Sequence, residues 1–228
     1  MASTMSRASR LISALLALGA VAYTAWTLEV VLATGLDPAE TYVSELAATD
    51  QPLGALFRTT DLIAGLLFLA AAVTALLQGE RGPRWTTAGW VGMAVFGAAT
   101  AVDSRFPLSC APIDDPGCAA RERAGLVPFT HVAHTVSSSV AIGGALVALV
   151  ALTVAARRYG RWAPVARFGP HLVAVELLAS LWTLVAVAAV EVGRGPWFLG
   201  AGQRLQVLLI AVWAVLLAYA LAGRERAG

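Results

Sequence analysis

Six long apolar stretches follow one another along this chain, and they constrain its fold more than any other feature. They run over about 11–34, 57–78, 85–102, 128–156, 168–190 and 203–222. Each holds roughly the 20 mainly apolar residues that a helix needs to cross the hydrocarbon core of a bilayer. The connections between them are too short for a separate soluble domain. The sequence therefore predicts a single all-α domain, residues 1–228, built as a membrane bundle of six helices.

The composition supports a bilayer as the solvent of this chain. Hydrophobic residues make up 58% of it and charged residues 13%, with a mean hydropathy of +0.73. All sixteen cationic side chains are arginine, so a Schiff base on lysine, and with it a retinal-binding protein, is excluded. The net charge of +2 is small, and the arginines lie in short connections, which argues against a nucleic-acid partner.

The arginines also predict an orientation. They alternate from one connection to the next, in four groups that fall on one side of a six-crossing bundle: Arg7 and Arg10; Arg81 and Arg84; Arg157, Arg158, Arg161 and Arg167; Arg224 and Arg226. The positive-inside rule makes that side cytoplasmic. We therefore expect a multi-pass protein of the cell membrane with both termini in the cytoplasm.

Two features are expected in the connections on the outer side. Cys110 and Cys118, the only cysteines, lie in the connection after the third stretch, where an oxidising compartment favours a disulfide over two free thiols. In the first outer connection Asp37 and Pro38 form a helix-start signal. This predicts a short helix to about Ala48 that lies flat at the outer interface.

Ionisable side chains inside membrane spans are costly, so their positions are the best functional evidence in the sequence. Most fall in the outer half of the predicted bundle. Two stretches carry polar faces at helical spacing: His131, His134, Thr135 and Ser138 in the fourth, and Glu176, Ser180, Thr183, Val187 and Glu191 in the fifth. Together they predict an outward-opening polar cavity.

The histidine pair allows two interpretations. His131 and His134, three residues apart, can ligate zinc together with Asp103, Asp61 or Glu191. Alternatively, both histidines hydrogen-bond Asp103 or the disulfide loop. The remaining histidine, His171, is expected on the cytoplasmic side, away from this site.

Plain structural interpretations stand beside the functional ones for the other polar residues. Ser138, one helical turn from His134, can act as a nucleophile or serve helix packing. Asp61 can pair with Arg58 one turn earlier, and Glu29 and Glu191 can lie at the headgroup level. Glu176 lies deeper in its span and needs a partner, water or a proton.

The chain resembles the six-helix prokaryotic membrane family known as domain of unknown function 998. The resemblance rests on Tyr42-Val43-Ser44-Glu45-Leu46, on Phe106-Pro107 and on the histidine-bearing start of the fourth stretch. It implies the fold and the membrane location but no reaction. Where such families carry an acidic residue soon after Phe-Pro, this chain has Leu108-Ser109-Cys110. The layout is also similar to ceramidase-like zinc hydrolases, but the third histidine is on the wrong side.

Two functional hypotheses follow. In the first, the outer cavity binds a lipid or another amphipathic molecule and, in its extended form, hydrolyses or remodels it with His131, His134, Asp103 and Ser138. The candidate binding residues are Glu29, Ser44, Glu45, Asp61, Glu176, Ser180, Glu191 and Arg204. In the second, the protein is a non-catalytic transporter or accessory subunit that uses Glu176 and the polar face of the fifth stretch.

Overall fold

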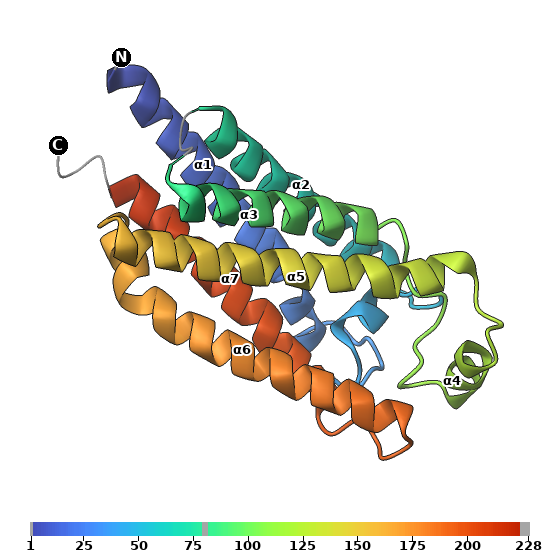
Figure 1. Ribbon diagram of the computed structural model, residues 1–228. Coiled ribbons are helices and arrows are strands. Elements are labelled where there is room, and N and C mark those ends of the chain that lie inside the picture. Colours follow the sequence, from blue (N-terminus) through green and yellow to red (C-terminus); the bar gives the residue numbers. More distant parts are fainter. Residues whose placement is uncertain (1, 79–81, 224–228) are drawn as a thin grey trace.

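The computed structural model describes residues 2–78 and 82–223, and within these ranges the chain is entirely helical (Figure 1). Seven α-helices and two 3₁₀ helices, and no strand, occur in the described ranges, which confirms the predicted all-α class. Their bounds are α1 Ala2–Tyr23, η1 Ala25–Val30, η2 Val43–Ala47, α2 Gly54–Leu77, α3 Arg84–Asp103, α4 Pro116–Arg123, α5 Phe129–Arg158, α6 Ala163–Glu191 and α7 Leu199–Gly223.

Five helical segments within the described chain are long and apolar enough to cross a membrane. They are Arg7–Val30, Gly54–Leu77, Phe129–Arg158, Ala163–Glu191 and Leu199–Gly223. Helix α3, which corresponds to the third predicted crossing, is not among them, because glycines and threonines replace apolar side chains along it. The protein is therefore a multi-pass membrane protein by length and composition, and its sixth crossing stays a prediction.

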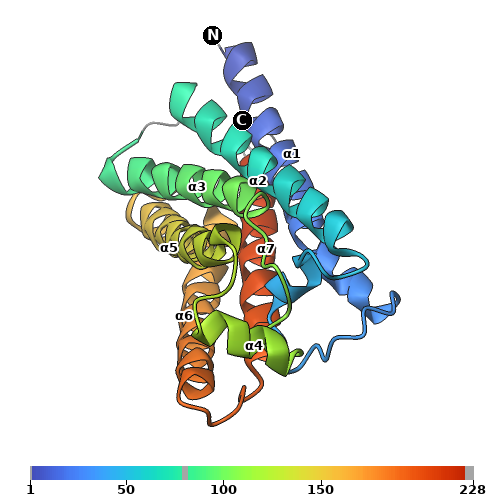
Figure 2. The same cartoon turned by 90° about the vertical axis from the view of Figure 1, so that its right-hand side faces the viewer.

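Helix α3 is the packing centre of one half of the bundle. It lies between α2 and α5 (Figure 2) and makes its main contacts with these two helices. A Cβ atom on Gly97 would lie 2.4 Å from the backbone nitrogen of Leu69 in α2, and one on Gly92 would lie 2.8 Å from that of Ala148 in α5. Only glycine permits backbones to approach so closely.

The first and last helices close the other half. Helix α1 packs against both α2 and α7, and the Ser13 hydroxyl in α1 donates a hydrogen bond to the Ala218 carbonyl in α7 at 2.7 Å. Between α1, α2 and α3, the rings of Tyr23, Phe68 and Phe96 meet with centroids 5.2–6.0 Å apart. The core is thus continuous from α1 to α3.

Helices α5 and α6 diverge. They are joined by a short turn at 159–162 and separate along their length (Figure 1). The ends that separate lie on the side of the bundle that also carries η1, η2 and α4. The opposite side collects the basic ends of the helices, with Arg84 starting α3 and Arg157 and Arg158 ending α5. Arg81, Arg224 and Arg226 of the predicted basic groups lie outside the described residues.

The chain after the first crossing differs from the prediction in two ways. The predicted stretch 11–34 was placed too far along the chain, because α1 ends at Tyr23 and continues as the 3₁₀ helix η1. The predicted flat interfacial helix from Asp37 to about Ala48 is not confirmed, because a turn after Asp37 and the 3₁₀ helix η2 occupy this range. Asp37 caps only a turn, in which its Oδ1 accepts the Ala39 N–H at 2.8 Å. The backbone N–H of Val43 then donates a hydrogen bond to the Gln203 side chain of α7 at 2.7 Å. This N–H is therefore not available for the backbone hydrogen bond of an α-helix.

The connection between α3 and α5 holds a helix that the sequence pattern did not predict. The predicted disulfide Cys110–Cys118 is confirmed, with Cα atoms 5.9 Å apart. Helix α4 starts inside this ring. Asp115 is its N-cap and accepts the Gly117 N–H at 2.8 Å, and Pro116 is its first residue. The signal is the same Asp-Pro pair that occurs at residues 37 and 38.

Candidate functional site

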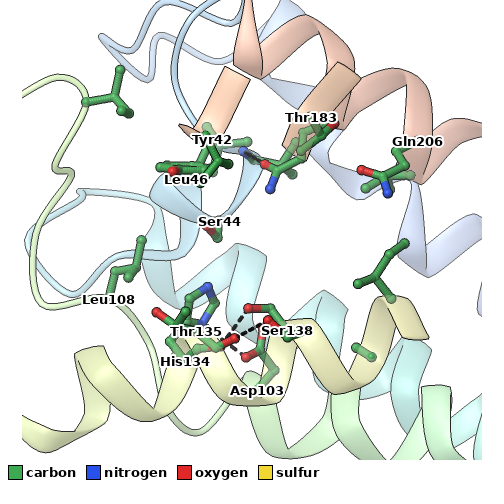
Figure 3. A pocket seen from close by; sticks show the side chains of 18 of the residues that line it. Tyr42, Ser44, Leu46, Asp103, Leu108, His134, Thr135, Ser138, Thr183 and Gln206 are labelled. Atoms are coloured by element: carbon green, nitrogen blue, oxygen red, sulfur yellow. Dashed lines mark hydrogen bonds and ion pairs between the residues drawn. The ribbon is translucent and has the colours of Figure 1, made fainter. Parts of the chain in front are cut away.

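A cavity of about 550 Å³ lies between the diverging ends of α5 and α6. Residues of α1, α2, α3 and α7 form its inner walls, and η2 and α4 lie over its outer end. Figure 3 shows Asp103, His134 and Ser138 on one side of the cavity and Tyr42, Thr183 and Gln206 across it. The polar residues that line it include Tyr23, Ser44, Asp61, Thr100, Glu122, Arg123, Thr135, Ser139, Ser180, Glu191 and Gln203.

His134 and Asp103 form the central polar pair. The Nδ1 atom of His134 lies 3.1 Å from Asp103 Oδ1 and 3.1 Å from the Phe106 carbonyl oxygen. Both neighbours accept hydrogen bonds, so in the neutral ring Nδ1 carries the proton and Nε2 keeps its lone pair. The Ser137 hydroxyl also donates to Asp103 Oδ1. This arrangement orients the imidazole of His134 and makes its Nε2 atom a base.

Ser138 lines the cavity next to this pair. Its hydroxyl donates to the carbonyl oxygen of His134 at 2.6 Å, within the same helix. In this rotamer the Ser138 proton is directed at the backbone and not at the imidazole of His134. Thr135 and Ser139, which are exposed on α5, continue the polar face along the same edge of the cavity.

His131 belongs to a different environment from His134. Its Nδ1 atom accepts the Ser109 N–H at 3.1 Å and lies 2.9 Å from the Ser109 hydroxyl. Its Nε2 atom lies 3.4 Å from Glu122 Oε1 in α4. His131 is buried and does not line the cavity. It therefore ties the disulfide loop to α5, as the structural interpretation of the histidine pair expected.

The residues described here contain no group of three or more His, Cys, Asp or Glu side chains placed to hold a metal ion. Of the proposed zinc ligands, His134, Asp103, Asp61 and Glu191 line the cavity, and His131 faces away from it. The zinc site stays a hypothesis without a third clustered ligand.

Asp61 lines the inner end of the cavity and has no hydrogen-bond or ion-pair partner in the described part of the chain. Arg58, which the sequence offered as its partner, is engaged elsewhere. Its Nη1 atom donates to the Ala47 carbonyl at 2.6 Å and to the Ala48 carbonyl at 3.2 Å. Arg58 thus holds the end of η2, and the interpretation of an Arg58–Asp61 pair is not supported.

Glu29 and Arg204 form a buried, bidentate ion pair outside the cavity lining. The Nε and Nη2 atoms of Arg204 each lie 2.7 Å from a carboxylate oxygen of Glu29. The Nη1 atom of Arg204 donates to the Thr41 carbonyl at 2.8 Å. The pair clamps η1, the 37–42 turn and α7 together, so it positions the cavity wall without lining it.

The two residues of the Ser44–Glu45 motif lie in different places, one in the cavity lining and one against the disulfide loop. Ser44 lines the cavity, whereas Glu45 is fully buried away from it and accepts the Ile113 N–H at 2.8 Å. Burial raises the pKa of Glu45 to about 8, although the bond from Ile113 lowers it. Burial likewise raises the pKa of Tyr42, which lines the cavity, to about 12.

Most residues of the polar face of α6 line the cavity. Ser180, Thr183 and Glu191 line the cavity, and Glu176 lies buried beyond Ser180. The Ser180 hydroxyl lies 3.4 Å from Glu176 Oε1 and accepts the Gln206 amide at 2.8 Å. Glu176 is thus connected to the cavity through Ser180 without lining it.

Several cavity residues were missed in the sequence. Tyr23 and Trp26 lie at the end of an apolar stretch, where aromatic residues are usually interface anchors. Gln203 and Gln206 are uncharged and were passed over. Their spacing of three residues in a span was the signal that could have placed a polar face on α7.

Comparisons with known proteins identify a family and no closer relative. The family model described as "Protein of unknown function (DUF998)" matches residues 15–220. The chain matches no curated protein and no solved structure. The match covers most of the chain, including every helix that lines the cavity. The chain therefore belongs to the DUF998 family of proteins of unknown function.

Proposed function

We propose that this protein binds an amphipathic molecule, a lipid or a lipid-like compound, in the cavity between α5 and α6. The observation that carries the proposal is the two-sided lining of this cavity. His134, Asp103 and Ser138 form a polar wall, and the apolar side chains of Ile142, Leu146, Leu184, Val187 and Ile210 line the same space. A volume of about 550 Å³ is in the range of sites that bind small organic molecules.

The opening between α5 and α6 suits entry from the bilayer. Thr135 and Ser139 on α5 and Leu184 on α6 line the cavity and are exposed on the outside of the bundle. Leu184 is 66% exposed. An acyl chain can therefore lie between the two helices while its head group reaches the polar wall.

The proposal includes the membrane arrangement. Helix α3, with 20 residues, is about 30 Å long at 1.5 Å per residue, which matches the hydrocarbon core. We take it as the sixth crossing, screened from lipid by α2 and α5. The arginine-bearing helix ends then face the cytoplasm with both termini, and the cavity opens toward the outer side of the cell membrane.

A cavity-filling substitution tests lipid binding. The purified protein in lipid nanodiscs would be irradiated with a photoactivatable lipid, and the labelled peptides would be mapped. Ile142→Trp places a large ring inside the cavity, whereas Val147→Trp places it on the exposed face of the same helix. We expect labels on α5 and α6 that Ile142→Trp reduces and Val147→Trp leaves unchanged. Equal labelling of the wild type and Ile142→Trp would remove the proposal.

Acid–base catalysis is the second candidate, favoured by the contact between His134 Nδ1 and Asp103 Oδ1. In this role His134 Nε2 takes a proton from a water molecule that attacks an ester carbonyl of the bound lipid, and the proton then passes to the leaving alcohol. His134→Gln should abolish turnover of an ester-bearing amphiphile and weaken its binding far less than it lowers turnover. The zinc content of the purified protein decides whether metal assistance belongs to this reaction.

The transport hypothesis depends on Glu176 and the Ser180–Gln206 contact. This buried chain leads from the cavity toward the middle of α6, where a carboxyl group can exchange a proton. Proton or solute flux in proteoliposomes that is the same in Glu176→Gln and in the wild type would count against it.

A further inference from the structure

The charges that line the cavity do not balance. Apart from the phenols of Tyr23 and Tyr42, its ionisable side chains are four carboxyl groups, one guanidinium and one imidazole: Asp61, Asp103, Glu122, Glu191, Arg123 and His134. Arg123 belongs to α4 and lies at the outer end, so the deeper part holds Asp61, Asp103 and His134 alone. On the basis of the proposed binding of an amphipathic molecule, we infer that its head group carries an ammonium cation and that Asp61 is the counter-ion.

Asp61 differs from Asp103 in what surrounds it. Asp103 contacts the imidazole of His134 and the hydroxyl of Ser137, which together hold its orientation. Asp61 has neither a hydrogen-bond donor nor a cation in contact with it in residues 2–78 and 82–223. A carboxyl group at membrane depth requires a cation, a proton or water. Asp61 lines the cavity, so a molecule bound there can supply the cation.

The cationic groups of the neighbouring helices are already engaged. His134, whose charge acts on Asp61, is held by Asp103 and the Phe106 carbonyl. Arg58, one turn from Asp61 along α2, donates to the Ala47 and Ala48 carbonyls. Arg204 is held by Glu29 and the Thr41 carbonyl. Moving either guanidinium to Asp61 would leave buried groups unpaired, so these arginines do not supply the missing charge.

Aromatic side chains beside Asp61 fit an ammonium group. Tyr23 lines the cavity together with Asp61. Trp26 and Tyr42 line the wall that continues toward the outer end. Ring faces attract cations, and a quaternary or primary ammonium group between rings and a carboxylate gains from both contacts. An anionic head group in the same place would lie against two carboxyl groups.

Three probes with the same dodecyl chain test the head-group charge. Dodecyltrimethylammonium, dodecyl maltoside and dodecyl sulfate, each below its micellar concentration, would compete with the photoactivatable lipid for the wild-type protein in nanodiscs. We expect the ammonium probe to compete at about ten-fold lower concentration than the neutral one, because it adds a charge contact in a desolvated site. The sulfate probe should be the weakest. An equal or reversed order would overturn the inference.

Substitution of Asp61 assigns the preference to one side chain. Asp61→Asn should remove most of the ammonium preference and leave competition by dodecyl maltoside unchanged. Asp50→Asn makes the same chemical change on an exposed loop residue outside the cavity and should keep the preference. If Asp61→Asn keeps the preference, Asp61 is not the counter-ion. Competition by the neutral probe reports on the cavity itself, so failure of the inference is distinguishable from failure of the proposed function.

Discussion

Glu45 illustrates how a single buried carboxyl group links the two outer connections. One of its oxygens accepts the Ile113 N–H of the disulfide loop, and the other has no hydrogen-bond partner among the described residues. Burial raises the pKa of Glu45 from 4.5 to about 8, so the folded protein holds a proton that the unfolded chain releases. This contribution to stability is complete below pH 4.5 and is lost as the pH rises through about 8.

We therefore predict that the protein loses thermal stability between about pH 4.5 and pH 8, the range in which the unfolded chain has released the Glu45 proton and the folded protein still holds it. Glu45→Gln keeps a neutral side chain of the same shape and should flatten this pH dependence. Unfolding temperatures in detergent at several pH values measure it. Asp50→Asn, on an exposed residue, is the control and should retain the wild-type slope. A wild-type slope in Glu45→Gln would show that another group is responsible.

The Arg204–Glu29 pair gives a second prediction for single residues. Arg204→Met leaves the carboxylate of Glu29 buried without its bidentate partner, which should cost about 3–5 kcal/mol of unfolding free energy. Replacing both residues with apolar ones should restore much of that loss. Arg121→Met is the control. It breaks an ion pair to Asp115 whose two side chains are 51% and 47% exposed, so its effect should stay within about 1 kcal/mol.

The sequence identified many polar residues of the site but not their directions. Helical spacing placed His131 and His134 on one face, yet Ser109 and Glu122 hold the first outside the cavity, while Asp103 positions the second in its wall. Ser109 and Glu122 come from a connection whose path the sequence pattern does not define. The sequence therefore could not tell that His131 fixes the disulfide loop to α5 while His134 lines the cavity. Both roles depend on partners from distant parts of the chain.

At the scale of elements, the close crossing of α2 and α3 depends on a glycine. A Cβ atom at Gly97 would lie 2.4 Å from the Leu69 nitrogen and 2.7 Å from the Gly65 carbonyl oxygen. Gly97→Ala must therefore push the two helices apart, at a cost of about 1–3 kcal/mol. Gly143→Ala on α5 is the matched control, since no atom lies within 4 Å of the added carbon. Thermal unfolding of both variants measures the difference, and equal unfolding temperatures would contradict the close crossing.

The disulfide loop is an element whose loss should be local. Replacing Cys110 and Cys118 with serine opens a ring with a sequence separation of 8 and should cost about 2–3 kcal/mol in the chain-entropy model. We expect hydrogen exchange to rise over 108–125, which includes α4. The contacts among α2, α3 and α5 do not pass through the ring, so exchange there should stay as in the wild type. Uniform acceleration across all helices would show instead that the ring supports the whole bundle.

Two Asp-Pro pairs show how far local signals define an element. Asp115-Pro116 starts α4, whereas Asp37-Pro38 starts only a turn. The difference lies in the partners of the following backbone. After Asp37, α7 engages the Val43 N–H and the Ala39 carbonyl, so the segment continues as η2 beneath α4. Local sequence predicted a helix start at the first pair, and tertiary hydrogen bonds changed the outcome.

At the scale of the whole molecule, the membrane orientation can be measured directly. In a Cys110→Ser/Cys118→Ser background, one new cysteine would replace Asp50 in the outer connection and another would replace Tyr159 in the α5–α6 turn. We expect an impermeant thiol reagent to label the first in intact cells and the second only after permeabilisation, because the proposed orientation places the arginine-bearing ends in the cytoplasm. The reverse pattern would invert the assignment and place the cavity on the cytoplasmic side.

Hydropathy predicted the number and approximate position of the long helices, because each long apolar stretch must be buried in a bilayer or in a protein core. It could not establish that α3 is a crossing, since a helix screened by α2 and α5 carries glycine and threonine where a lipid-facing helix carries leucine. Helical spacing predicted a polar cavity but not its size. Its volume depends on the angle at which α5 and α6 diverge, and no periodicity within either helix encodes that angle.

The contact between α1 and α7 has a consequence for synthesis. Helix α1 is synthesised with Ile12, Leu16 and Ala20 on the face that becomes buried. Part of the surface that α1 packs against belongs to α7, which is synthesised much later. Glu29 likewise gains its ion-pair partner only when Arg204, 175 residues later in the chain, has been synthesised. A nascent chain that ends before α7 thus has no inner wall for the cavity and a carboxylate without its guanidinium. The cavity is therefore complete only after α7 has been synthesised, so a molecule that occupies it would bind after the earlier helices have been inserted.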